Sequence, residues 1–539
     1  MFSRFKSLFE IRCIILFLVL PGVLVFPEAS RAGVKNVIII VADGMGFQQV
    51  ALLNAYAKYA PNSIYRARGR KTALEAMTEA GVAGFVYHEA ADVLVTDSAA
   101  SATQFSSGKW AGSEMLGVDK DGNPTVTILE RAEQLGKSTG LVSDTRITHA
   151  TPAAFAAHQP HRSMENEIAV DMLNNDVDVM LGGGLRYWIP RSANDRKSEI
   201  HRELTKRTQG KVKITSKRKD GRNLLQEAES KGYKTVFTKE QLAGAQGNKV
   251  LGLFSPSGMP DGIWQTLNEK SPGRTVPNLK EMTAKAIEVL SKNDKGFFLM
   301  VEAGQIDWAG HANDAGTMLH ELIQFDETLN YVLSWARSRN DTLLIVTADH
   351  ETGGFGFSYS RANVPEARDF PGDRFKGRKF KPSFNFGNHG ILDKIYKQKL
   401  SYGRILSRFY QLPKARQTPA AMAEIINANT EFPITEEEGA RILKVERNKY
   451  YAKGNKYLDQ DVFPKIDDFD AFYVYGDNIR TDLIARVVAA QQNVVWSTGT
   501  HTNALVPIIA YGPEDVTSWF SRMSHTTEWG QYAMDVLTK

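Results

Sequence analysis

The sequence predicts an α/β fold in which a central, mostly parallel sheet carries helices on both faces. Short apolar runs, rich in β-branched residues, alternate with longer segments of helical character. The runs are 37–41, 138–142, 177–181, 297–301, 342–346 and 504–510. Because they are apolar throughout, we expect them in the centre of a sheet that is buried on both faces. Ligands collect beyond the carboxyl ends of such strands, and here those ends are followed by carboxylates, histidines and glycines.

The first 32 residues read as a signal peptide rather than as part of the fold. Three basic residues precede the apolar stretch 13–26, and small residues lead up to a cleavage site after Ala32. We therefore expect an exported protein, periplasmic or secreted, with no membrane span in the mature chain. A retained anchor is the weaker alternative, because a spanning helix needs about 20 apolar residues. The only cysteine of the chain would leave with this leader.

Residues 33–539 are expected to form a single catalytic domain with two insertions. Residues 183–275 and 357–495 break the strand and helix rhythm, and we expect them to be surface loops and cover elements. Segments 420–426 and 480–491 within the second insertion look helical. The net charge of +5 is too small to indicate a polyanionic partner, and the sequence contains no recognisable nucleic-acid module.

Metal-ligating residue types gather after several of the predicted strands. Asp307 and His311 are four residues apart, so a helical turn would place both side chains on one face. Further candidates are Asp43, Glu302, Asp349, His350 and His501. Mixed Asp and His ligands favour zinc or another transition metal. Two such ions about 4 Å apart suit an in-line phosphoryl transfer.

Ser98 is the candidate nucleophile. It lies in a run of small residues, 95–103, which can open a helix whose N-terminal amides face an anion, and Asp97 precedes it. A serine needs a base or a metal to become a nucleophile. The segment has no Gly-x-Ser-x-Gly pattern, so metal activation is favoured over a Ser-His-Asp triad.

Six motifs together resemble those of the alkaline phosphatases. They follow the order of that family and cover roughly residues 35–185, 280–356 and 495–512. The motifs are Asp43–Gly46, Thr96–Thr103, Ala150–Ala154, Glu302–His311, Thr347–Gly354 and His501.

The resemblance implies two zinc ions and one magnesium ion. One zinc would be held by Asp307, His311 and His501. The second would be held by Asp43, Asp349 and His350, with Ser98 as the bridging nucleophile. Magnesium would be held by Asp43, Thr151 and Glu302, whose hard oxygen ligands suit that ion.

The resemblance also implies the reaction. Small-molecule phosphate monoesters would be hydrolysed through a phosphoserine at Ser98, with Arg162 gripping the phosphate oxygens. His149 and Trp308 stand where one branch of the family has Asp and Lys. We expect an indirect role for His149 near the third metal and the phosphate, and either packing or substrate contact for Trp308. A homodimer is expected by analogy with the family.

Two other function classes stay open on the sequence. A phosphodiesterase or sulfatase of a related scaffold could use similar metal clusters, and a non-catalytic envelope protein could bind phosphate without turnover. The filled nucleophile and ligand positions make the second reading the weaker one. Two other carboxylates, Asp314 and Asp326, are expected to be solvated on a helix.

Overall fold

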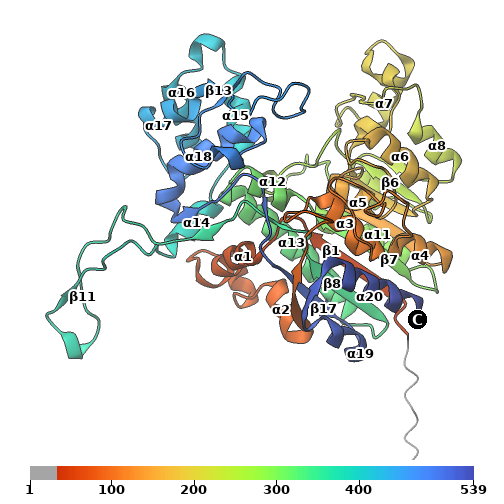
Figure 1. The fold of residues 1–539 in the computed structure, drawn as a ribbon, viewed down its shortest axis with the longest axis horizontal. Coiled ribbons are helices and arrows are strands. Elements are labelled where there is room, and N and C mark those ends of the chain that lie inside the picture. The colour runs from red at the N-terminus through yellow and green to blue at the C-terminus, as the bar shows by residue number, and fades with distance from the viewer. Residues whose placement is uncertain (1–32) are drawn as a thin grey trace, which may run out of the picture. The chain divides into compact units, whose positions relative to one another are not determined.

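A ten-stranded sheet forms the centre of the protein, in the order β18-β2-β17-β8-β1-β7-β3-β4-β6-β5 (Figure 1). The computed structural model describes residues 33–539, so the predicted signal peptide lies outside the described part. All six predicted strands are present: β1 (Asn36–Ala42), β3 (Ser138–Arg146), β4 (Val179–Gly183), β7 (Phe297–Ala303), β8 (Thr342–Thr347) and β17 (Val506–Tyr511). Strands β8, β1, β7, β3 and β4 pair in parallel, whereas β17 runs antiparallel to both neighbours. The predicted fold class is confirmed.

Four short strands at the two ends of the sheet have no counterpart among the predicted runs. They are β2 (Val82–Tyr87) and β18 (Met523–His525) at one end, and β5 (Lys234–Val236) and β6 (Val250–Leu253) at the other. Strands β5 and β6 belong to residues 183–275. The expectation that this region only covers the surface is therefore wrong, because it extends the sheet by two strands.

Two groups of helices cover the two faces of the sheet. Helix α11 packs on β3, β4 and β7 and against α13, while α4 and α20 pack on β-strands of the same centre and against α3. The helices of the core are α1 (Phe47–Tyr59), α2 (Ala73–Ala80), α3 (Ser98–Ser107), α4 (Ile128–Gln134), α5 (Ala150–Ala153), α6 (Glu165–Asn174), α10 (Gly262–Asn268), α11 (Leu279–Leu290), α12 (Gln305–His311), α13 (Ala315–Ala336), α19 (Glu514–Thr517) and α20 (Thr526–Thr538). Three more helices, α7 (Glu199–Arg207), α8 (Leu224–Ser230) and α9 (Lys239–Ala243), lie with α10 in residues 183–275.

The second insertion builds its own helical group, coloured blue to cyan in Figure 1. It contains α14 (Gly390–Tyr396), α15 (Tyr402–Tyr410), α16 (Pro419–Asn429), α17 (Glu436–Leu443) and α18 (Gly476–Gln492), together with the hairpin of β13 (Val445–Arg447) and β14 (Val462–Pro464). The two helical segments predicted here correspond to α16 and α18. A second hairpin, β11 (Arg368–Asp369) with β12 (Lys379–Phe380), extends away from this group (Figure 1).

The expectation for Asp314 and Asp326 is wrong, because both side chains are buried. Asp314 caps the N-terminus of α13 and accepts hydrogen bonds from the amide of Thr317 (3.0 Å) and the amide of Tyr402 (2.7 Å). Asp326 accepts hydrogen bonds from the hydroxyl of Tyr65 at 3.0 Å and from two backbone amides at the start of α2. These carboxylates tie α13 to distant segments of the chain. Over residues 33–539 no helix is long and apolar enough to cross a membrane.

Candidate functional site

The candidate site lies where the central parallel strands end. Asp43 follows β1, Glu302 lies near the end of β7, and the Asp349-His350 pair follows β8. Because these strands are neighbours in the sheet, their carboxyl ends bring the side chains to one edge. Gly44 lets the chain turn here with φ +77°, and a Cβ at this position would lie 2.7 Å from the Cα of Asp307.

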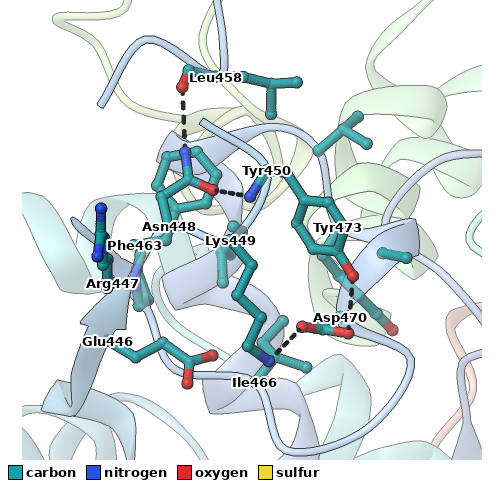
Figure 2. A pocket seen from close by; sticks show the side chains of 14 residues that line it. Glu446, Arg447, Asn448, Lys449, Tyr450, Leu458, Phe463, Ile466, Asp470 and Tyr473 are labelled. Atoms are coloured by element: carbon teal, nitrogen blue, oxygen red, sulfur yellow. Dashed lines mark hydrogen bonds and ion pairs between the residues drawn. The ribbon is translucent and has the colours of Figure 1, made fainter. Parts of the chain in front are cut away.

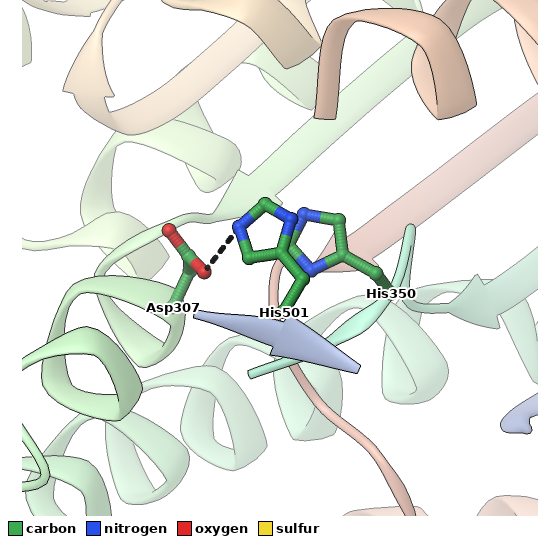
Figure 3. A group of neighbouring side chains, drawn as sticks. All are labelled: Asp307, His350 and His501. Atoms are coloured by element: carbon green, nitrogen blue, oxygen red, sulfur yellow. Dashed lines mark ion pairs between the residues drawn. The ribbon is translucent and has the colours of Figure 1, made fainter. Parts of the chain in front are cut away.

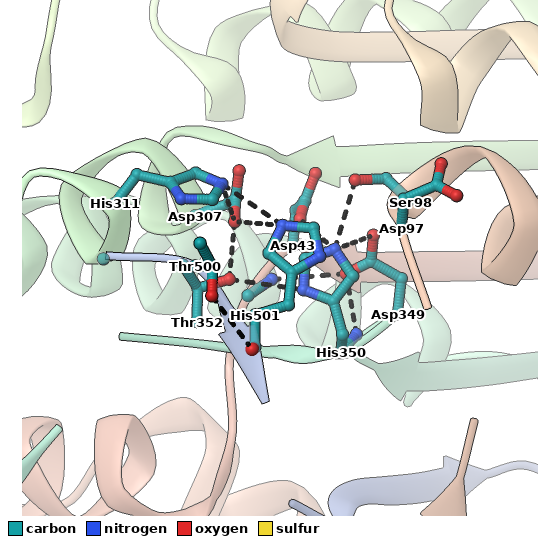
Figure 4. Close-up of polar contacts among 12 residues, drawn as sticks. Asp43, Asp97, Ser98, Asp307, His311, Asp349, His350, Thr352, Thr500 and His501 are labelled. Atoms are coloured by element: carbon teal, nitrogen blue, oxygen red, sulfur yellow. Dashed lines mark hydrogen bonds and ion pairs between the residues drawn. The ribbon is translucent and has the colours of Figure 1, made fainter. Parts of the chain in front are cut away.

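Asp307, His311 and His501 form one predicted ligand group, and the structure brings them together (Figure 4). Asp307 and His311 lie on α12, as the four-residue spacing predicts, while His501 lies in β16 (His501–Thr502). The Oδ1 atom of Asp307 is 3.4 Å from Nε2 of His311 and 3.6 Å from Nε2 of His501. The two Nε2 atoms are 3.2 Å apart. One cation could therefore be shared by all three side chains.

A second group, Asp43, Asp349 and His350, lies directly beside the first. Nε2 of His350 is 3.6 Å from Oδ1 of Asp43 and 3.2 Å from Oδ2 of Asp349. The imidazole rings of His350 and His501 stack with their centroids 3.5 Å apart, so the two ligand groups are in direct contact (Figure 3). The potential ligand atoms of Asp43, Asp349 and His350 all lie within 4.8 Å of one another, and the same holds for Asp307, His350 and His501.

The third group is centred on Glu302 and Asp43. Among histidine, cysteine, aspartate and glutamate side chains, His149 completes with these two residues a set whose ligand atoms lie within 4.8 Å of one another. Thr151 is buried nearby, and its hydroxyl oxygen has no hydrogen-bond partner within residues 33–539. The Oε2 atom of Glu302 accepts hydrogen bonds from Ser143 and, at 2.9 Å, from Thr145, whereas Oε1 has no hydrogen-bond partner within residues 33–539. One oxygen of Glu302 is thereby fixed, and the other is left for a ligand.

Hydrogen bonds orient the imidazoles of the first group toward its centre. Nδ1 of His311 lies 2.8 Å from the carbonyl oxygen of Gly499, and Nδ1 of His501 lies 2.9 Å from that of Thr96. A carbonyl oxygen only accepts, so each Nδ1 carries the proton and each Nε2 keeps its lone pair. The lone pairs face Asp307. This arrangement is typical of histidines that bind metal ions.

The burial of these charges gives a physical reason for a cation. Burial, together with the neighbouring carboxylates of Asp349 and Asp307, raises the pKa of Asp43 well above its usual value. Burial likewise raises the pKa of Asp349 to about 7 and lowers the pKa of His501 to about 4. Within residues 33–539, neither oxygen of Asp43 has a hydrogen-bond partner. Buried carboxylates facing neutral imidazoles are stabilised by divalent cations, so the side chains fit metal ions.

Ser98 lies at the first position of α3, as the sequence predicts, and faces the second ligand group. Its Oγ is 3.2 Å from Nε2 of His350. Asp97 caps the helix by accepting the amide of Ala99 at 2.8 Å, and the same carboxylate is 3.2 Å from Nη1 of Arg162. The helix N-terminus and the guanidinium of Arg162 therefore flank the serine with positive potential, which suits an anionic substrate.

His149 and Trp308 lie on the other side of Arg162. Nη2 of Arg162 is 3.3 Å from Nε2 of His149, and since a guanidinium only donates, this nitrogen is the acceptor. Trp308 meets the His149 ring edge to face with centroids 6.0 Å apart. It also packs over Gly258, where an added Cβ would lie 2.4 Å from the indole.

Some contributors to the site are absent from the sequence prediction. Thr352 donates to Oδ1 of Asp307 at 2.5 Å and lies 3.2 Å from Nδ1 of His350, so one hydroxyl links two ligand groups. Its place beside the Asp-His pair is the signal that could have found it. Tyr475, from the second insertion, meets the His311 ring edge to face at 4.9 Å. Burial and the nearby Asp307 carboxylate raise the pKa of its phenol to about 12.

A cavity of about 980 Å³ opens above Ser98. Its floor includes Ser98, Asp307, His311 and His501, and its outer wall comes from residues 454–478 of the second insertion. The cavity thus lies between the edge of the sheet and the second insertion.

A family model described as alkaline phosphatase matches residues 34–534. The chain belongs to the alkaline phosphatase family. Alkaline phosphatase 3 of Bacillus subtilis is 30% identical over 500 residues, covering 91% of this chain and 86% of that protein. The tissue-nonspecific alkaline phosphatase of Rattus norvegicus is 33% identical over 350 residues, covering 59% of this chain and 63% of its own length.

Solved structures of alkaline phosphatases have the same fold. The enzyme of Thermus thermophilus superposes with a TM-score of 0.71 at 25% identity, over 96% of each chain. The cold-active enzyme of a Shewanella species gives 0.66 at 25% identity, over 94% of this chain and all of the other. This alkaline phosphatase family member is therefore a phosphatase, with residues gathered for metal binding at its sheet edge.

Proposed function

We propose that the protein hydrolyses small-molecule phosphate monoesters to an alcohol and inorganic phosphate through a phosphoserine at Ser98. The observation that carries this proposal is the position of Ser98 Oγ, 3.2 Å from His350 Nε2, at a helix N-terminus and beside two adjoining ligand groups. Ser98 does not lie in a Gly-x-Ser-x-Gly segment, which is the setting of the serine in many Ser-His-Asp hydrolases.

The metals proposed are two zinc ions and one magnesium ion. Asp307, His311 and His501 would hold one zinc, and Asp43, Asp349 and His350 the other, with Ser98 between them. Asp43, Thr151 and Glu302 would hold magnesium, whose preference for oxygen ligands matches the unpartnered oxygens of all three side chains. When bound, these ions would supply positive charge that lowers the pKa of the serine hydroxyl and neutralises charge on the phosphoryl oxygens.

The side chains of the protein account for the remaining steps. The Ser98 hydroxyl gives up its proton to water, and its oxygen forms a bond to phosphorus as the bond from phosphorus to the alcohol oxygen breaks on the opposite side. The departing alkoxide takes up a proton from water and leaves as the alcohol. Arg162, held by Asp97 and His149, donates hydrogen bonds to phosphate oxygens that do not react. Water then attacks the phosphoserine from the side that the alcohol has left, which releases phosphate and restores the hydroxyl of Ser98. His149 acts indirectly, by orienting Arg162.

Phosphate release from a panel of esters tests this function. We expect the purified protein to hydrolyse monoesters in preference to diesters and sulfate esters, and elemental analysis of the same sample to find zinc. Ser98→Ala should abolish turnover but retain metal. Preferential hydrolysis of a diester or a sulfate ester would instead support the phosphodiesterase or sulfatase alternative. Near wild-type turnover by Ser98→Ala would overturn the assignment of the nucleophile.

Export is proposed from the sequence of residues 1–32. The basic start, the apolar stretch and the small residues before Gly33 support it. N-terminal sequencing of the protein recovered from outside the cytoplasm should begin at Gly33. Recovery from the cytoplasm with Met1 retained would contradict the proposal.

A homodimer is proposed on the basis of the hairpin β11–β12. Phe370, Phe375 and Phe380 pack on one another there, with ring centroids 5.2 and 5.3 Å from Phe370, yet each is 37–40% exposed. Such an exposed apolar cluster is stabilised when another surface covers it. Light scattering should give the mass of two chains, and replacing the three rings with serine should shift it toward one chain. A wild-type monomer would contradict this proposal.

A further inference from the structure

The cavity above Ser98 is much larger than the phosphate site at its floor. At about 980 Å³ it lies at the upper end of the range for pockets that hold small organic molecules, about 300–1,000 Å³. Its outer wall includes Lys456, Tyr457 and Tyr475, all from the second insertion. The leaving group of a bound monoester would therefore lie against these side chains.

Tyr475 and Tyr457 line the wall as a row of aromatic rings that begins at His311. Tyr475 meets the His311 ring edge to face at 4.9 Å and an interplanar angle of 81°. Tyr457 meets Tyr475 in the same way at 5.0 Å and 87°. Edge-to-face rings offer apolar surface and polarised edges that favour a planar partner over a saturated one. The row thus forms an aromatic wall leading outward from the reaction centre.

Lys456 stands at the outer end of this row. Its Nζ lies 4.7 Å from the centroid of the Tyr457 ring. Among the described residues no carboxylate lies within ion-pair distance of this ammonium. Three of the carboxylates that line the cavity are already paired: Glu114 with His161 at 2.9 Å, Glu165 with Arg146 at 2.7 Å and Asp97 with Arg162 at 3.2 Å. The fourth, Asp307, belongs to the first ligand group. Lys456 therefore supplies uncompensated positive charge to the outer part of the cavity.

Asn448 holds the backbone on both sides of Lys456 and Tyr457, and Figure 2 shows its hydrogen bonds to Leu458 and Tyr450. Asn448 is 6% exposed, and its amide nitrogen donates to the carbonyl oxygens of Leu458 (3.0 Å) and Gln460 (2.9 Å). Its amide oxygen accepts the backbone amide of Tyr450 at 2.9 Å. The backbone that flanks Lys456 and Tyr457 is thus fixed before a ligand arrives, which reduces the entropic cost of binding.

We propose that Lys456, Tyr457 and Tyr475 form a leaving-group subsite that favours monoesters whose alcohol carries a planar ring with a negative charge at its far end. This inference rests on the proposed function, because it assigns the part of the substrate that leaves. The aromatic wall packs against the ring, and the ammonium of Lys456 attracts the distal anion.

Three esters with similar alcohol leaving groups test the subsite: cyclohexylmethyl phosphate, benzyl phosphate and 4-carboxybenzyl phosphate. We expect kcat/KM of the holoenzyme to rise in that order. Lys456→Gln should reduce the preference for 4-carboxybenzyl over benzyl phosphate about threefold, the size of a partly exposed charge interaction. Tyr457→Leu should reduce the preference for benzyl over cyclohexylmethyl phosphate about fivefold.

Lys453→Gln is the matched control, because Lys453 is an exposed lysine near the start of the same loop and does not line the cavity. It should leave both preferences unchanged. Equal kcat/KM for the three esters in the wild type, or equal loss of preference in Lys453→Gln and Lys456→Gln, would overturn the subsite while leaving the proposed function intact. Failure of the wild type to hydrolyse any of the three would overturn the proposed function itself.

Discussion

Replacing Thr352 with valine removes one hydroxyl and nearly preserves the shape of the side chain. That hydroxyl is fully buried, donates to Asp307 Oδ1 at 2.5 Å and lies 3.2 Å from Nδ1 of His350. Asp307 and His350 are proposed ligands of different zinc ions. Thr352 is therefore a positioning residue for both sites, and its loss should weaken zinc binding without removing any ligand.

The expected magnitude follows from the two hydrogen bonds. Loss of a group that orients metal ligands typically weakens metal affinity by about 10- to 100-fold. At about 1.4 kcal/mol for each factor of ten, this corresponds to about 1.4–2.8 kcal/mol. A hydrogen bond to a charged group contributes about 1.5–3 kcal/mol, so the loss of the donor to Asp307 alone accounts for the effect.

Competition with a zinc chelator measures the affinity directly. Thr352→Ser keeps the hydroxyl and should restore most of the zinc affinity. Thr283→Val is the matched control, because Thr283 is equally buried and its hydroxyl donates to the carbonyl of Leu279 at 2.8 Å, within α11. The reasoning is refuted if Thr352→Val binds zinc as tightly as the wild type, or if Thr283→Val weakens zinc binding as much.

Two further predictions concern stability. Burial raises the pKa of Glu281, but hydrogen bonds from Arg274, Lys239 and a backbone amide outweigh it and lower that pKa to about 2. The carboxylate therefore stabilises the fold above about pH 4.5, and this contribution is lost as the pH falls toward 2. Glu281→Gln should cost roughly 2 kcal/mol at pH 7, allowing for the 28% exposure of the side chain, and little near pH 2 in metal-depleted protein. An equal cost at both pH values in denaturant titrations would contradict this. Asp326→Ala leaves a tyrosine hydroxyl and two amides without their acceptor and should cost about 3 kcal/mol. Glu327→Ala, which breaks only solvent-accessible ion pairs with Arg68 and Lys280, should cost less than about 1 kcal/mol. Similar melting temperatures for these two variants would contradict the role of Asp326.

The central strands and the individual candidate ligands could be predicted because their signals are local, whereas the grouping of these ligands around shared ions came from the resemblance to the alkaline phosphatases. A wholly apolar run that is followed by Asp43 or by Asp349-His350 predicts both a buried strand and the end of that strand at which ligands bind. The four-residue spacing of Asp307 and His311 likewise fixes their common face once α12 forms. These features need no knowledge of distant residues.

Most of the wrong and missing predictions depend on contacts between distant segments. Asp314 and Asp326 are polar on a helix, which usually means solvent exposure, but donors from remote parts of the chain make their burial favourable. Strands β5 and β6 are short and lie at the sheet end, so their sequence carries little periodicity. Tyr475 reaches the cavity only because the second insertion folds over the sheet edge.

The central claim is that Ser98 carries the phosphoryl group during turnover. Acid quenching during steady-state hydrolysis of a monoester, followed by mass spectrometry of the peptides, tests it directly. We predict a phosphate on the peptide that contains Ser98 in the wild type and an unmodified peptide in Ser98→Ala. A phosphorylated residue elsewhere, or full turnover by Ser98→Ala, would contradict the proposed mechanism.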